Sequence, residues 1–173
     1  MQKVMFATVT RVTDRDNILE KVYWIVNRIA LFQELDVHQL ALLKPFFEQL
    51  SLRAGTIIFQ QGETAKFIYF VISGTVDISF KPYDGIPITV SHVGKGGLFG
   101  WSAIVGSEKY TSSAIAIEPA KVFRVQGSEL RKFCVEHPEA GKEILERLAD
   151  GASSRWKDAN KQVKAILLQG LKR

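Results

Sequence analysis

The feature that most constrains this chain is a stretch of short apolar runs broken by glycines between residues 54 and 126. Four runs rich in Ile, Val, Phe and Thr carry the pattern: residues 54–59, 67–80, 86–93 and 112–125. Turn signals at Ser73-Gly74 and Tyr83-Asp84-Gly85 separate strand-like pieces. Many short strands joined by tight turns favour a barrel or a double-sheet roll over a parallel sheet.

The segment before residue 54 is predicted to be mostly helical. Residues 14–31 carry apolar side chains with a period of about 3.6, which predicts an amphipathic helix. Asp36, followed three residues later by Gln39, predicts a capping box at the start of a shorter helix. The apolar stripe of that helix comprises Leu40, Leu43, Phe46 and Phe47. Alternating β-branched residues within 1–12 leave a short strand open as an alternative there.

Residues 127–173 are predicted to return to helix. One helix begins at Gly127 or Ser128 and ends before His137-Pro138, and the next covers residues 139–148. Gly151 ends or loosens that helix, and residues 152–171 form the last one. Helices on both sides of a β-rich middle indicate an α+β fold, and 173 residues fit one domain with appended helices.

Composition excludes several classes of protein. Apolar residues make up 46% and charged residues 24% of the chain, which is typical of a folded globular protein. No apolar run approaches the roughly 20 residues that span a bilayer, and residues 1–8 lack the pattern of a signal peptide, so we expect a cytoplasmic protein. The single cysteine, Cys134, is interpreted as a small buried apolar residue.

The positive charge of the chain is concentrated at one end. Residues 153–173 carry six basic residues against Asp158 alone, a net charge of +5. Residues 1–152 hold 17 basic and 17 acidic residues and are neutral. Lys157, Lys161 and Lys164 line one face of the last predicted helix. Such a row is usually solvated; its alternative use is to contact an acidic partner, or nucleic acid without sequence specificity.

Three segments in this order and spacing resemble the cyclic nucleotide-binding domain family, which includes the sensor half of the catabolite activator protein. They are residues 31–35 (LFQEL), 55–63 (GTIIFQQGE) and 67–76 (FIYFVISGTV). The resemblance covers about residues 30–150. It implies an eight-stranded antiparallel β-roll of jelly-roll type, flanked by N- and C-terminal helices. We therefore expect an N-terminal extension over residues 1–30, the roll domain over 31–150 and a basic amphipathic helix over 151–173.

Residues 97–114 fall where this family places its phosphate-binding cassette. The family pattern is a strand, a Phe-Gly-Glu turn, a short helix, and then Pro-Arg followed by small residues. Glycine lets the backbone approach the ligand, and the helix points free N–H groups at the cyclic phosphate. The glutamate accepts a hydrogen bond from the ribose, and the arginine binds the phosphate.

This chain keeps the frame of the cassette and lacks both charged side chains. Trp101 stands in place of the glutamate, and Lys109-Tyr110 stand in place of Pro-Arg. The candidate ligand-binding residues are Gly100, Trp101, Ser102, Ala103, Lys109, Tyr110, Thr111 and Ser112. A hydrogen bond to a charged group contributes roughly 1.5–3 kcal/mol, so losing two weakens binding on the order of 10²- to 10⁴-fold.

Trp101 and Tyr110 leave three interpretations open. They fill the vacated pocket as core aromatics, or form an aromatic wall for a different flat ligand, or contact a partner. Lys109 lies one residue before the arginine position, and a shift of one residue on a strand points a side chain to the other face. The helix N–H groups and the hydroxyls of Ser102 and Thr111 would still favour an anion.

The last predicted helix carries an apolar stripe that includes Trp156, Ala159, Val163 and Ile166. In the bacterial regulators that this chain resembles, the equivalent helix forms the dimer axis, so a homodimer is expected. A helix packed back on its own domain is the alternative. The chain stops at Arg173, where such regulators add a helix-turn-helix domain, so we expect no sequence-specific DNA binding.

An enzymatic role is not expected. His38, His92 and His137 fall in a helix, a strand and a helix end, so they do not form a metal triad, and no nucleophile–base pair is evident. The leading hypothesis is a non-enzymatic regulatory module that senses a small molecule, with weak or no cAMP binding. Its ligand would be a cyclic nucleotide or another small anionic metabolite. The alternative is a binding-silent module kept for dimerisation or protein contacts.

Overall fold

The computed structural model describes residues 8–11, 29, 32, 35–83, 85–105 and 107–150. Apart from Ile29, the predicted helix over 14–31 lies outside the described residues. The same holds for the whole of the predicted last helix over 152–171, with its proposed dimer residues Trp156, Ala159, Val163 and Ile166.

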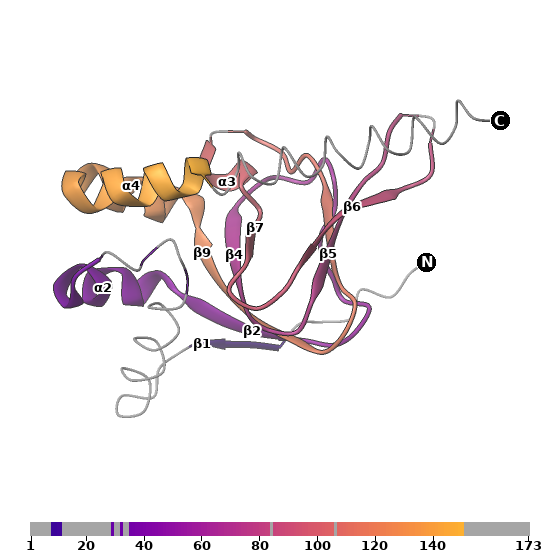
Figure 1. The fold of residues 1–173 in the computed structure, drawn as a ribbon, viewed down its shortest axis with the longest axis horizontal. Coiled ribbons are helices and arrows are strands. Elements are labelled where there is room, and N and C mark those ends of the chain that lie inside the picture. The colour runs from indigo at the N-terminus through magenta and orange to yellow at the C-terminus, as the bar shows by residue number, and fades with distance from the viewer. Residues whose placement is uncertain are drawn as a thin grey trace.

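Two antiparallel sheets form a roll in the described part of the chain (Figure 1). The strands are β1 (Thr8–Arg11), β2 (Glu48–Leu52), β3 (Ile57–Phe59), β4 (Phe67–Ser73), β5 (Val76–Phe80), β6 (Ile88–Val93), β7 (Leu98–Phe99), β8 (Ser113–Ala116) and β9 (Ala120–Gln126). One sheet has the order β1-β2-β9-β4-β7 and the other β3-β8-β5-β6. Strands β2 to β9 are the eight strands of the predicted roll, and β1 pairs with β2. The predicted fold class is therefore confirmed.

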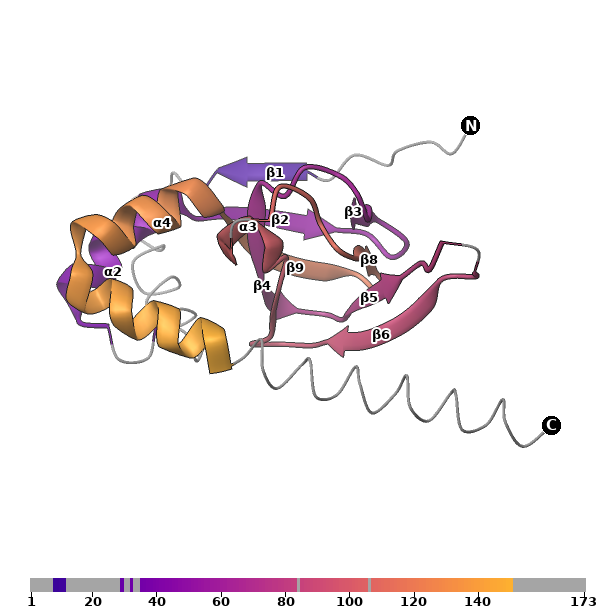
Figure 2. The same cartoon turned by 90° about the horizontal axis from the view of Figure 1, so that it is seen from above.

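Helices gather at one end of the roll, opposite the hairpin of β5 and β6 (Figures 1 and 2). They are α2 (Val37–Leu43) with a short 3₁₀ turn η2 (Lys44–Phe46), α3 (Ser102–Val105), α4 (Gly127–Glu136) and helical residues 138–150. The predicted capping box is present: Gln39 N donates to Asp36 Oδ1 at 2.8 Å, and Asp36 N donates to Gln39 Oε1 at 2.9 Å. The predicted start of α4 at Gly127 is confirmed as well.

The sheet that holds β4 and β9 is covered on both faces, which divides the core into two clusters. Alternate residues of β4 belong to different clusters, so Phe70 contacts the helices whereas Tyr69 faces the inside of the roll. We call the first cluster the helix-side core; it includes Phe32, Leu43, Phe47, Phe70, Phe123, Leu130, Phe133 and Ile144. We call the second the roll interior; it includes Leu50, Phe59, Tyr69, Val71, Phe99, Tyr110, Ala114 and Val122. Because both faces are buried, β4 reads as a nearly continuous apolar run.

The prediction of helix up to residue 53 is wrong at its end. Helix α2 stops at Leu43, and Pro45 lies in the 3₁₀ turn that follows, so Phe46 and Phe47 do not share one helical stripe. Residues 48–52 form strand β2. The sequence already has the alternation of a strand, because Leu50 and Leu52 are apolar and Ser51 between them is polar. In the structure, the two leucines are buried and Ser51 is exposed.

The N-terminal part of the chain contributes to the same fold. Of the two interpretations for residues 1–12, the strand is found over residues 8–11. Ile29 is buried in the helix-side core, one residue before the expected domain boundary at residue 30. That boundary stays a prediction. Among the residues that the structure describes, no helix is long and apolar enough to cross a bilayer.

Asp36→Ala should lower the free energy of unfolding by about 1 kcal/mol, because the first turn of α2 loses the acceptor for the Gln39 amide. The measurement is urea denaturation followed by circular dichroism. Asp36→Asn is the matched control, since asparagine caps helices as well as aspartate does. Equal stability of the alanine variant and the wild type would contradict this role of the cap.

Candidate functional site

The cassette starts with a glycine turn between β7 and α3. Gly100 has a φ of +83°, in the left-handed region that favours glycine. A Cβ atom on Gly100 would lie 2.7 Å from the Phe67 carbonyl oxygen and 3.1 Å from the ring of Tyr69. The glycine therefore lets β7 and α3 pass close against the start of β4.

Helix α3 uses its own amide groups within the turn. Ala103 N donates to the Gly100 carbonyl at 3.1 Å, and Ile104 N and Val105 N donate to the Trp101 carbonyl at 2.9 and 3.2 Å. Ser102, Ala103 and Ile104 are buried. The amides of Ala103, Ile104 and Val105 are thus engaged with backbone carbonyls of the same turn.

After α3, the chain pairs with the turn that precedes β4. Tyr110 N donates to the Glu63 carbonyl and Gly62 N donates to the Tyr110 carbonyl, both at 2.9 Å. A bridge between Thr64 and Lys109 lies beside these bonds. This short ladder fixes which side chains face inward. Lys109 is exposed and Tyr110 is buried, so the residue in the arginine position points into the roll and the lysine points to solvent.

Tyr110 is built into the roll interior, where only 4% of its surface is exposed. Its ring stacks on Phe59, with centroids 3.7 Å apart and planes 12° apart. Its hydroxyl donates to the Phe67 carbonyl at 2.8 Å and accepts from the Phe67 amide at 3.0 Å. Burial raises the pKa of this hydroxyl, so it stays protonated and able to donate at neutral pH.

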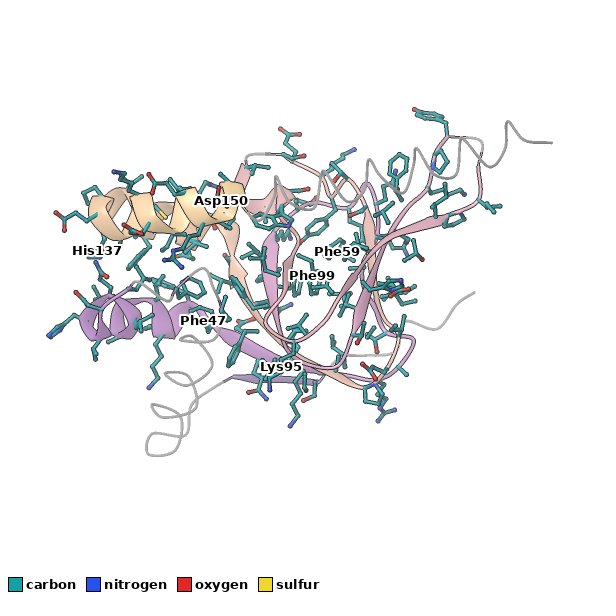
Figure 3. The ribbon with its side chains drawn as sticks, in the orientation of Figure 1. Phe47, Phe59, Lys95, Phe99, His137 and Asp150 are labelled. Carbon is teal, nitrogen blue, oxygen red and sulfur yellow. The ribbon has the colours of Figure 1, made fainter. Side chains whose placement is uncertain are left out.

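Further aromatic side chains pack next to Tyr110. Tyr69 stacks on Phe99, with centroids 5.0 Å apart and planes 7° apart, and Phe59 contacts both. Figure 3 shows Phe59 and Phe99 within the ring of strands, whereas Phe47 lies beside α2. Aromatic side chains therefore occupy the part of the roll that the cassette faces.

The eight candidate residues do not share one environment. Trp101 is partly buried and packs against the helix-side core, away from the cluster that holds Tyr110. Ser102 and Ala103 are buried in α3, whereas Lys109 and Thr111 are exposed and Ser112 is half-buried. Trp101 and Tyr110 thus pack against different clusters of the core. The role of these residues in ligand binding stays a prediction.

Helix α4 contacts the cassette through its backbone. A Cβ atom on Gly127 would lie 2.0 Å from the Ala103 carbonyl oxygen, so only glycine fits there without a shift. The Arg131 guanidinium also donates a hydrogen bond to the Ala103 carbonyl oxygen. Ala103 in α3 is therefore held by the first two turns of α4.

Sequence reasoning missed a charged pair inside the roll. Arg124 in β9 bonds to Glu48 in β2, with Nε and Nη2 each 2.8 Å from Glu48 Oε2, and its guanidinium lies 4.1 Å from the centre of the Phe67 ring. A signal was present, because Arg124 interrupts an apolar run in the strand Ala120–Gln126.

The histidines lie apart from the cassette and from one another. His92 Nδ1 is 2.6 Å from Asp77 Oδ1 on neighbouring strands β5 and β6, and the His137 ring packs 4.6 Å from that of Phe133. His38 is exposed in α2. Over the described residues, no group of three or more His, Cys, Asp or Glu side chains is placed to hold a metal ion.

Gly100→Ala should destabilise the protein by about 1–2 kcal/mol or more, because a non-glycine residue is strained at this φ and its Cβ would press on the Phe67 carbonyl. Gly94→Ala is the matched control, since a Cβ atom there meets nothing within 4 Å. Thermal unfolding by calorimetry compares the two variants. A Gly100→Ala protein as stable as the control would argue against the close approach of β7 and β4.

Comparison with known proteins gives relatives among transcriptional regulators, regulatory subunits of cAMP-dependent protein kinase and a putative potassium channel protein. The CRP-like cAMP-activated global transcriptional regulator of Mycobacterium tuberculosis is 27% identical over 125 residues, which are 72% of this chain and 56% of that protein. A cyclic nucleotide-binding domain from Methylobacillus flagellatus superposes with a TM-score of 0.75 at 18% identity, covering 91% of this chain and 88% of the other. The regulatory subunit of a cAMP-independent protein kinase A from Trypanosoma brucei gives 0.70 at 16% identity, covering 86% and 51%.

The chain spans little more than half the length of the mycobacterial regulator, so the comparison concerns one part of that protein. The two structural likenesses show the same fold. The profile of the cyclic nucleotide-binding domain matches residues 49–137, just over half of the 173 residues, and includes the cassette. With the roll, the glycine turn and the short helix in place, this chain belongs to the cyclic nucleotide-binding domain family.

Proposed function

We propose that this chain is a non-enzymatic regulatory module whose cassette is closed by its own aromatic side chains and binds cAMP weakly or not at all. One observation carries the proposal. The side chain in the position of the phosphate-binding arginine is Tyr110, which is buried, stacked on Phe59 and hydrogen-bonded twice to Phe67. The position that would present a positive charge to a cyclic phosphate instead completes the core of the roll.

The energies support weak binding. A nucleotide in this position must displace the Tyr110 side chain, which breaks two hydrogen bonds of about 0.5–1.5 kcal/mol each and an aromatic stack of similar strength. It would then find neither the arginine nor the glutamate of the family pattern, since Tyr110 and Trp101 stand in their places. Both effects reduce affinity, and they act on the same ligand.

The relatives support a regulatory role without requiring cAMP. The mycobacterial relative is named as a transcriptional regulator, and another relative, from Dictyostelium discoideum, is a regulatory subunit of cAMP-dependent protein kinase. The trypanosome subunit has the same fold and is described as part of a cAMP-independent kinase. In the present chain, a ligand or partner that moved α3 would act on α4 through Gly127 and Arg131. Such an effector would shift the population between two helix arrangements.

The second candidate function is a binding-silent module that serves dimerisation or protein contacts. The packed aromatic side chains of the roll interior favour it, because they leave the module folded without a ligand. We also propose that the stripe Trp156, Ala159, Val163 and Ile166 forms the seam of a homodimer. The two candidates differ in whether any small molecule stabilises the protein.

Wild-type protein should show no rise in melting temperature with cAMP or cGMP, whereas the double variant Trp101→Glu/Tyr110→Arg should gain affinity for cAMP by at least about tenfold. The variant has both charged residue types of the family pattern and places a guanidinium at the inward-facing position of residue 110. Thermal shift and isothermal titration calorimetry measure both. A wild-type chain that binds cAMP at micromolar concentration would overturn the proposed function.

Trp101→Glu/Thr111→Arg is the matched control for that experiment. It has the same two new charges, but Thr111 is exposed whereas Tyr110 is buried. Circular dichroism checks that each variant is folded before binding is compared. Equal gains in both double variants would mean that added charge alone attracts cAMP, which would remove the significance of the inward position.

Trp156→Glu should convert a dimer into monomers, because a charge in the apolar stripe must be desolvated for the helices to pack. Light scattering coupled to size-exclusion chromatography gives the mass. Lys157→Glu, next to the stripe, has a larger change of charge and should leave the dimer intact. An unchanged mass of the Trp156→Glu protein would exclude this seam.

A further inference from the structure

The inner face of the roll contains an arginine next to the cassette. Arg124 in β9 lies directly opposite Glu48 in β2 and Tyr69 in β4, and directly paired residues of neighbouring strands share a face. Tyr69 belongs to the roll interior, as does Val122, two residues before Arg124 on the same strand. Arg124 therefore faces the inside of the roll, although it does not come from the cassette.

The guanidinium of Arg124 binds a carboxylate of this chain in a half-buried position. The Arg124 side chain is 22% exposed and that of Glu48 is 25% exposed. Both Nε and Nη2 donate to the same oxygen, Glu48 Oε2, at 2.8 Å, and the ring of Phe67 lies against the guanidinium. Apolar side chains often replace such a pair without loss of stability, so stability alone does not account for two charges here.

Arg124 also neighbours the residue that replaced the cassette arginine. Phe67, whose ring contacts Arg124, binds the Tyr110 hydroxyl through its backbone amide and carbonyl. The pKa of Tyr69 is raised mainly by burial, and the nearby side chains of Tyr110 and Arg124 both act on it, the latter in the opposite direction. The Arg124 guanidinium thus lies next to Phe67 and Tyr69, which contact residues of the cassette.

We infer that Arg124 recognises a small carboxylate, and that Glu48 occupies the place of this ligand in the free chain. The inference rests on the proposed function, because it assigns a ligand class to the roll interior beside a cassette that does not take cAMP. A carboxylate is the group that Arg124 binds now, in a site that solvent partly reaches. Exchange of Glu48 for a ligand keeps the guanidinium paired and changes the contacts of Phe67 and Tyr69, which touch the cassette.

The test is chemical rescue with acetate. Glu48→Ala removes the Cγ atom and the carboxylate, which together have the composition of acetate, and leaves the Arg124 charge uncompensated. The variant should melt several degrees below the wild type. Acetate, compared with chloride at equal ionic strength, should restore much of this loss. Glu118→Ala, at an exposed glutamate in the β8–β9 turn, should show neither the loss nor the rescue.

Two further variants make the result specific. Addition of Arg124→Met to Glu48→Ala should abolish the effect of acetate. Glu48→Gln, which keeps the shape of the side chain, serves if the alanine variant does not fold, and its Arg124 Nε–H resonance should shift with acetate. In the wild type the same resonance should shift with roughly tenfold or more weaker apparent affinity, since the internal carboxylate competes at a millimolar or higher effective concentration.

Three outcomes would overturn the inference: no rescue of Glu48→Ala or Glu48→Gln, rescue that persists without Arg124, or a wild-type Nε–H resonance that never moves. In each case the pair is a cross-strand ion pair only. Binding of cAMP by the wild type would overturn the proposed function and leave the acetate results to be judged separately. The failures of the two proposals are therefore distinguishable.

Discussion

The whole structure depends on one sheet that is buried on both faces. Strands β4 and β9 pair along their length, and successive side chains in each enter the helix-side core and the roll interior in turn. The helices and the roll interior therefore both pack on the same two strands. The cassette is placed by this sheet, because β7 pairs with β4 and α4 leaves the end of β9.

Within this frame, the cassette has the glycine turn and the short helix of the family, with aromatic residues at two of its positions. Gly100 and the short helix α3 set the course of the backbone through the cassette, and both are present. The positions that contact a nucleotide in the family serve packing here: Trp101 supports the helix-side core and Tyr110 supports the roll interior. In a site of this kind, an aromatic residue can replace a charged residue without loss of the fold. The aromatic side chain fills the same space and gains apolar burial.

Most of the fold and the location of the cassette could be predicted from the sequence. The predictions failed for features that depend on contacts between residues far apart in the sequence. The capping box at Asp36 and the turns at Gly74 and Gly85 are local, so the residue types alone indicate them. Strand β2 was missed because its short alternation follows a helix that ends at an internal proline. The direction of Tyr110 could not be read from its neighbours, because the ladder with residues 62–65, distant in sequence, fixes which face it takes.

The contact between Gly127 and Ala103 has a mechanical consequence. Two helices usually meet through side chains, which can change rotamer and absorb small displacements of one helix relative to the other. Here the backbone of α4 lies against the backbone of α3, with no Cβ atom between them. At this contact, no side chain of residue 127 can change rotamer to absorb a displacement. A displacement of α3 would therefore reach the first turn of α4 by direct backbone contact at residue 127, without passing through a side chain of that residue.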